Sequence, residues 1–102
     1  MGAVSLIVIH TDRLDECRRF YADTGLPLSR ERHGSGPEHY AAVLDGGVVL
    51  ELYPTGRRAA TGYLRIGLTV ATEHSAFPPG RHTLTDPDGR TVDLTVALSS
   101  SA

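Results

Sequence analysis

The apolar positions along this chain form short runs typical of strands, interrupted once by a run typical of a helix. Residues 4–10 are rich in β-branched side chains and predict a buried strand. Three side chains then recur at the spacing of an amphipathic helix: Leu14, Cys17 and Tyr21. We expect Asp12 to cap this helix and Gly25 to end it in a left-handed conformation. We also expect Cys17 to pack against the core rather than act as a nucleophile.

The rest of the chain predicts further strands, separated by turns rich in glycine and proline. The expected strands cover residues 26–32, 39–44, 48–53, 63–71, 81–85 and 91–98. Asp45-Gly46-Gly47 predicts a hairpin because glycine accepts positive φ, and Asp86-Pro87-Asp88-Gly89 predicts a tight turn. Between residues 72 and 80, Pro78-Pro79 leaves room for at most one helical turn.

The order of these elements repeats along the chain. Leu6-Ile7-Val8-Ile9 resembles Arg65-Ile66-Gly67-Leu68, and Leu50-Glu51-Leu52 resembles Val92-Asp93-Leu94. Over the matched span, the second copy is 17 residues shorter than the first. That difference is about the length of a helix of 11–12 residues plus a short loop. The second copy is therefore expected to have lost its helix.

This repeat predicts an α+β fold in a single domain over residues 1–102. We expect module one at about residues 4–54, a linker at about 55–62, and module two at about 63–98. Residues 54–62 carry a proline, two glycines and two adjacent arginines, a composition that predicts a linker. The two arginines, Arg57 and Arg58, could guide an anionic ligand.

Composition and charge exclude several classes of function. Apolar residues make up 40% of the chain and charged residues 22%, which is ordinary for a globular protein. The net charge of −2 provides no basic surface for nucleic acid, and no apolar run is long enough to span a bilayer. The single cysteine cannot form an internal disulfide, and we expect a cytoplasmic protein without a signal peptide.

Three segments together resemble a known superfamily. They are residues 12–26, with Phe20-Tyr21 followed by Gly25-Leu26; residues 49–53; and residues 86–94. In this order they resemble the vicinal oxygen chelate superfamily, also called the glyoxalase/bleomycin resistance/dioxygenase superfamily. The resemblance implies two βαβββ-type modules that form a cupped mixed sheet, the second module lacking most or all of its helix. It also implies a pocket on the concave face, within one chain or between two subunits.

The resemblance further implies four positions where metal-dependent relatives hold a divalent metal. In this sequence they fall on Leu6, Glu51, Arg65 and Asp93, of which only the two acids can bind a metal. His10 lies at even spacing from Leu6 and could join Glu51 and Asp93 as a metal ligand. Alternatively, Arg65 replaces the metal and forms a buried ion-pair network with the two acids.

Because two of the four metal-ligand positions cannot bind a metal, the sequence favours a protein that holds a small molecule in the cupped sheet without a cofactor. The residues expected to contact the ligand are Leu6, Tyr40, Tyr53, Tyr63 and Arg65. One alternative is a metal-independent lyase, isomerase or cyclase with Glu51 or His10 as general base. Another is a metal-dependent glyoxalase or dioxygenase-type enzyme.

Two further expectations concern the surface. One of His39 and Tyr40 must face the cup, because successive strand residues point to opposite faces. His33, His39, His74 and His82 are otherwise expected to be surface side chains. The missing helix leaves one face of the second module uncovered, and a homodimer is the simplest way to cover it.

Overall fold

The fold comes from a computed structural model and is described for residues 1–98. It contains one helix, α1 (Leu14–Thr24), and seven strands: β1 (Leu6–Thr11), β2 (Ser29–Glu31), β3 (His39–Val43), β4 (Val49–Pro54), β5 (Arg65–Ala71), β6 (Gly80–Thr85) and β7 (Thr91–Ala97). Two short 3-10 turns complete it, η1 (Asp45–Gly47) and η2 (Thr72–His74). Within residues 1–98 no helix has the length and apolar character needed to cross a membrane.

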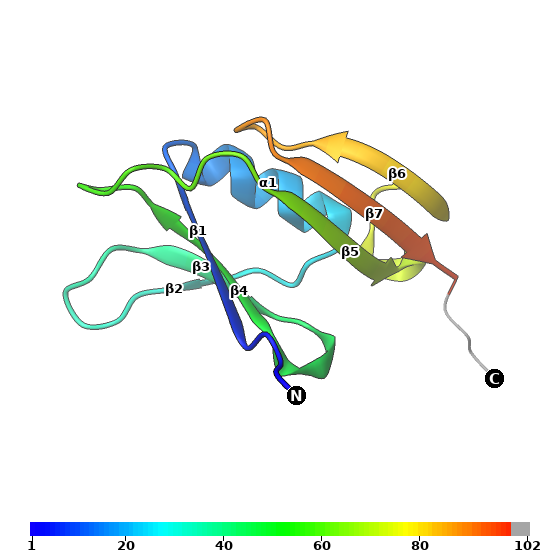
Figure 1. Ribbon diagram of the computed structural model, residues 1–102, viewed down its shortest axis with the longest axis horizontal. Helices are drawn as coiled ribbons and strands as arrows, with labels where there is room; N and C mark the ends of the chain where they lie inside the picture. The colour runs from blue at the N-terminus through cyan, green and yellow to red at the C-terminus, as the bar shows by residue number, and fades with distance from the viewer. Residues whose placement is uncertain (99–102) are drawn as a thin grey trace.

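The strands form two mixed sheets with related topology (Figure 1). The first has the order β1-β4-β3-β2 and the second the order β5-β7-β6. β1 is parallel to β4, and β5 is likewise parallel to β7. In the first module α1 lies between β1 and β2 along the chain. In the second module only the turn η2 lies between β5 and β6. The prediction of an α+β fold whose second module lacks its helix is confirmed.

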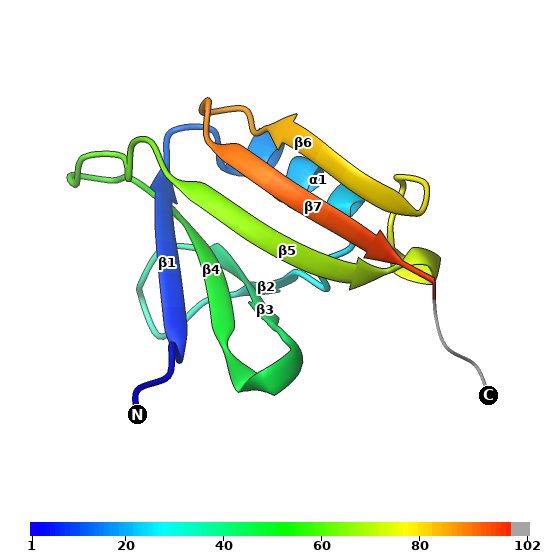
Figure 2. The same cartoon turned by 45° about the vertical axis from the view of Figure 1, so that its right-hand side comes forward.

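The helix packs against both sheets and so forms the centre of one core. In both views α1 lies against the second sheet as well as the first (Figures 1 and 2). The buried apolar residues form one cluster: Ile9, Cys17, Tyr21, Leu26, Ala42, Leu50, Leu52, Leu68, Val92, Leu94 and Val96. The apolar face of the second sheet is therefore covered within the chain. The expectation that this face is left uncovered was wrong, because the single helix α1 packs against both sheets.

The structure corrects the prediction for the start of α1 and confirms the prediction for its end. Asp12 does not cap the helix; its carboxylate accepts a hydrogen bond from the Thr55 hydroxyl at 2.6 Å. The neighbouring Thr11 hydroxyl instead accepts a hydrogen bond from the Arg13 backbone N–H at 2.9 Å. Gly25 ends the helix at φ 124°, as predicted, in the range that favours glycine.

The turn between β6 and β7 holds a buried polar network. Arg90 is fully buried, and its guanidinium lies 3.1 Å from the Asp86 carboxylate and 2.9 Å from that of Asp88. The Tyr21 hydroxyl donates to Asp86 at 2.6 Å, and the Thr11 hydroxyl donates to Asp88 at 2.5 Å. The turn predicted from sequence is present, and it also connects β7 to β1 and α1.

Candidate functional site

The face of the first sheet that points away from α1 collects the candidate functional groups. Ile9, Leu50 and Leu52 are buried toward the helix, so His10, Glu51 and Tyr53 point the other way. The register aligns His10 with Tyr53 across β1 and β4. It also aligns Glu31 with His39 across β2 and β3.

Aromatic rings form a short stack on this face. The His39 ring lies 4.0 Å from the Tyr53 ring at an interplanar angle of 10°. The centre of the His10 ring lies 5.9 Å from the centre of the same Tyr53 ring. Burial, followed by the carboxylates of Glu51 and Glu31, raises the pKa of the Tyr53 phenol. Tyr53 therefore stays protonated and neutral at physiological pH.

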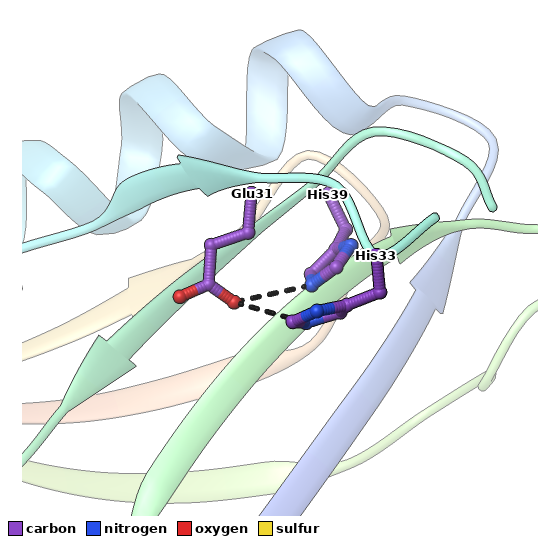
Figure 3. A group of neighbouring side chains, drawn as sticks. All are labelled: Glu31, His33 and His39. Carbon is purple, nitrogen blue, oxygen red and sulfur yellow. Dashed lines mark ion pairs between the residues drawn. The ribbon is translucent and has the colours of Figure 1, made fainter. Parts of the chain in front are cut away.

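His39 is buried, not a surface side chain as expected. Only 1% of it is exposed, and its Nε2 lies 3.3 Å from Glu31 and 3.7 Å from Glu51. His33 comes from the loop after β2, and its Nε2 lies 3.5 Å from the same Glu31 oxygen. Glu31, His33 and His39 thus offer three potential metal-ligand atoms, all within 4.8 Å of one another (Figure 3). His33 itself is exposed, as predicted.

A cleft of about 530 Å³ opens beside this stack. Its walls include Val8, His10, Glu51, Tyr53, Arg57 and Arg58. A larger cleft of about 740 Å³ lies between the β3–β4 turn and β5, near Leu26 and Val70. None of the predicted site residues lines that larger cleft. We therefore take the smaller cleft, where carboxylate, imidazole, phenol and guanidinium groups meet, as the candidate site.

The second sheet holds the other predicted pair of charges. The Arg65 guanidinium lies 2.6 Å from the Asp93 carboxylate, so the predicted contact between them exists. The pair is not buried, because 67% of the Arg65 side chain and 38% of the Asp93 side chain are exposed. Glu51 contacts neither of them; among the described residues, the His39 imidazole, at 3.7 Å, is the one basic group within ion-pair distance of its carboxylate. The predicted buried network of three groups was therefore wrong.

The remaining predicted contact residues lie in different surroundings. Tyr40 points to the helix side of its sheet, with the Arg18 guanidinium 5.5 Å from its ring centre. Tyr63 is 71% exposed and lies 3.0 Å from the Thr91 hydroxyl. Leu6 is 53% exposed at the start of β1. Tyr40 does not line the candidate cleft.

The positions that the resemblance assigns to a metal do not fit one in this chain. Leu6 offers no ligand atom, and Arg65 carries a positive charge that already engages Asp93. Glu51 is the one acid of the set that lies at the candidate cleft.

Comparisons with known proteins bear on the fold. The oxidase ChaP-H2 superposes with a TM-score of 0.60 at 16% identity, over 98% of this chain and 97% of that chain. Lactoylglutathione lyase from Agrobacterium tumefaciens gives 0.54 at 16% identity, over 92% of each chain. An integron cassette protein from V. cholerae gives 0.56 at 14% identity, over 94% and 95%.

A search with the sequence matched no protein-family model and no curated protein. The structural likeness shows the fold. The chain has the vicinal oxygen chelate fold, in a reduced form in which the second module keeps three strands and no α-helix within the described residues.

Proposed function

We propose that the protein binds a small planar molecule in the cleft beside the His39–Tyr53 stack. The observation that carries the proposal is this cleft itself, in which aromatic, acidic and basic side chains line one space of about 530 Å³. A volume of this size falls in the range of small-ligand sites. Val8 and Tyr53 supply apolar and aromatic surface, which suits a planar ring.

The charges at the cleft favour a ligand with a negative group. Arg57 and Arg58 are both exposed at the rim, on the segment that follows β4. Guanidinium groups bind carboxylates through two parallel hydrogen bonds. Glu51 lies deeper, so an acid group on the ligand would face the arginines and a hydroxyl or ring N–H would face Glu51.

An NMR titration with 1-naphthoate, a planar aromatic carboxylate, tests the proposal. We expect the largest amide shifts on β1 and β4 around His10 and Tyr53. Arg57→Ala should weaken binding several-fold, whereas Arg81→Ala, which removes an exposed arginine from β6, should leave it unchanged. The proposal fails if neither 1-naphthoate nor related planar acids bind saturably, or if the shifts map to the larger cleft near Val70.

One observation favours proton transfer as a second candidate function. Only 17% of the Glu51 side chain is exposed, and its carboxylate lies in the cleft beside the His39 imidazole. A carboxylate held this way could remove a proton from a bound ligand as a general base, with His10 as the alternative base. Deuterium exchange at an acidic C–H of a bound ligand would detect this role. Glu51→Gln should abolish such exchange while binding persists.

We also propose a homodimer, on grounds different from those of the sequence. Leu6 and Val43 are 53% and 67% exposed, and the register places both on the face of the first sheet opposite α1. A second copy seated on these apolar side chains would remove them from water. Light scattering should give twice the chain mass, and Leu6→Glu should return it to one chain. A wild-type monomer would contradict the proposal.

The cytoplasmic location stays a prediction.

A further inference from the structure

The hairpin of β2 and β3 brings three potential metal ligands together at one end of the sheet. Glu31 and His39 are register partners on these antiparallel strands, so their side chains leave the same face side by side. His33 follows Glu31 by two residues, and its ring lies 5.1 Å from the His39 ring. Figure 3 shows both imidazoles turned toward the Glu31 carboxylate.

Two of the distances within the cluster, those from Glu31 to each histidine, match the spacing between the ligands of a tetrahedral metal. Bonds of about 2.1 Å at the tetrahedral angle separate neighbouring ligand atoms by about 3.4 Å. The Glu31 Oε1 lies 3.3 Å from His39 Nε2 and 3.5 Å from His33 Nε2. His33 is exposed, so its ring has room to complete the geometry. A water molecule can take the fourth position.

The buried His39 gives an independent reason to expect a cation here. Its Nδ1 lies 3.3 Å from the Pro37 carbonyl oxygen, which can only accept a hydrogen bond. In the neutral ring this contact puts the proton on Nδ1 and leaves a lone pair on Nε2. Nε2 is buried and makes no hydrogen bond, although two carboxylates lie near it. A lone pair facing carboxylates is unfavourable unless a cation lies between them.

We propose that Glu31, His33 and His39 bind a divalent transition metal ion of the Zn²⁺ type. Two imidazoles and a carboxylate are a donor set that suits such ions. The Pro37 carbonyl holds the His39 ring in the tautomer a metal requires. This site lies on β2 and β3, apart from the positions that the fold resemblance assigns to a metal, and it does not depend on ligand binding in the cleft.

Calorimetric titration of the tag-free chain with ZnCl₂ at pH 7.5 tests the site. We expect one ion per chain, with at least tenfold weaker binding in His33→Ala and in Glu31→Gln. His74→Ala removes an exposed histidine outside the cluster and should bind as the wild type does. Binding should also weaken as the pH falls, because protons compete with the metal for the ligand atoms.

Nitrogen-15 NMR of the histidine rings supplies a readout that does not depend on the variants. Zn²⁺ should shift the Nε2 resonances of His33 and His39 and leave that of His74 in place. The proposal is overturned if no saturable binding occurs, or if the two cluster variants bind as tightly as His74→Ala. It is equally overturned if His39 carries protons on both nitrogens at pH 7.5 and does not respond to Zn²⁺, since a proton would then be the cation. None of these results would alter the 1-naphthoate titration.

Discussion

At the scale of single residues, the fold depends on a few positions that favour one residue type. Gly25 is the clearest of them. A Cβ at this position would lie 3.1 Å from the Val70 Cβ and 3.3 Å from the His74 carbonyl oxygen, on a backbone at φ 124°. A side chain at this position would therefore require the neighbouring Val70 and His74 to shift by a few tenths of an ångström.

Replacing this glycine should destabilise the fold. We expect Gly25→Ala to lower the free energy of unfolding by about 1–3 kcal/mol, from backbone strain and the clash with Val70. Urea denaturation would measure the loss. The matched control is Gly67→Ala on β5, where the φ is not in the left-handed range and no atom lies within 4 Å of the added Cβ. Equal stability of the two variants would contradict this reading of Gly25.

Cys17 illustrates a residue whose role sequence alone could assign. It is fully buried, and burial raises the pKa of its thiol to about 11, outweighing the hydrogen bond with Thr11. The thiolate that would act as a nucleophile is therefore nearly absent at neutral pH. The prediction that Cys17 packs against the core is confirmed.

At the scale of elements, the turn between β6 and β7 has more than a local role. Its sequence predicted the turn, and Gly89 adopts φ 90° as such a turn requires. The buried Arg90 then links Asp86 and Asp88 to the carbonyls of Gly62 and His10. The turn thus connects the second sheet to the end of β1.

Removing Arg90 should lower the stability of the fold, because it leaves two carboxylates without the cation that pairs with them. We expect Arg90→Ala to lower the free energy of unfolding by about 3–5 kcal/mol, the usual loss when one partner of a buried ion pair is removed. Arg81→Ala, on the exposed face of β6, should change it by less than about 0.5 kcal/mol. Urea denaturation compares them, and a loss below about 1 kcal/mol for Arg90→Ala would show that the network is dispensable.

At the scale of the whole molecule, this network ties stability to pH. Burial alone would raise the pKa of Asp88, but hydrogen bonds from Thr11 and Arg90 outweigh it and hold the pKa below its usual value. A carboxyl whose pKa is lower in the folded state stabilises the fold above its unfolded pKa of about 3.9. That contribution is lost as the pH falls through the lower, folded value.

The acid dependence of unfolding should therefore carry a contribution from Asp88. We expect the urea midpoint to decline below about pH 4, and Asp88→Asn to make that decline shallower. Asp45→Asn, on the exposed turn η1, should leave its slope unchanged. The assignment to Asp88 would be lost if both variants followed the wild-type curve.

The sequence by itself determined the elements and their order. β-Branched runs, helical spacing at Leu14, Cys17 and Tyr21, and glycine turns are local features, and each produced the element it predicted. The shorter second module followed from counting residues along the chain. The fold class could be predicted because these patterns depend only on neighbours in sequence.

Tertiary structure alone decided which charged groups meet. His39 is buried against Glu31 because two strands pair in one register across a seven-residue connection, and no local pattern specifies that pairing. Arg65 meets Asp93 at the surface rather than joining Glu51, because the two acids lie on different sheets. The candidate site depends on contacts between segments distant in sequence, and the energy of those contacts is set by burial and strand register.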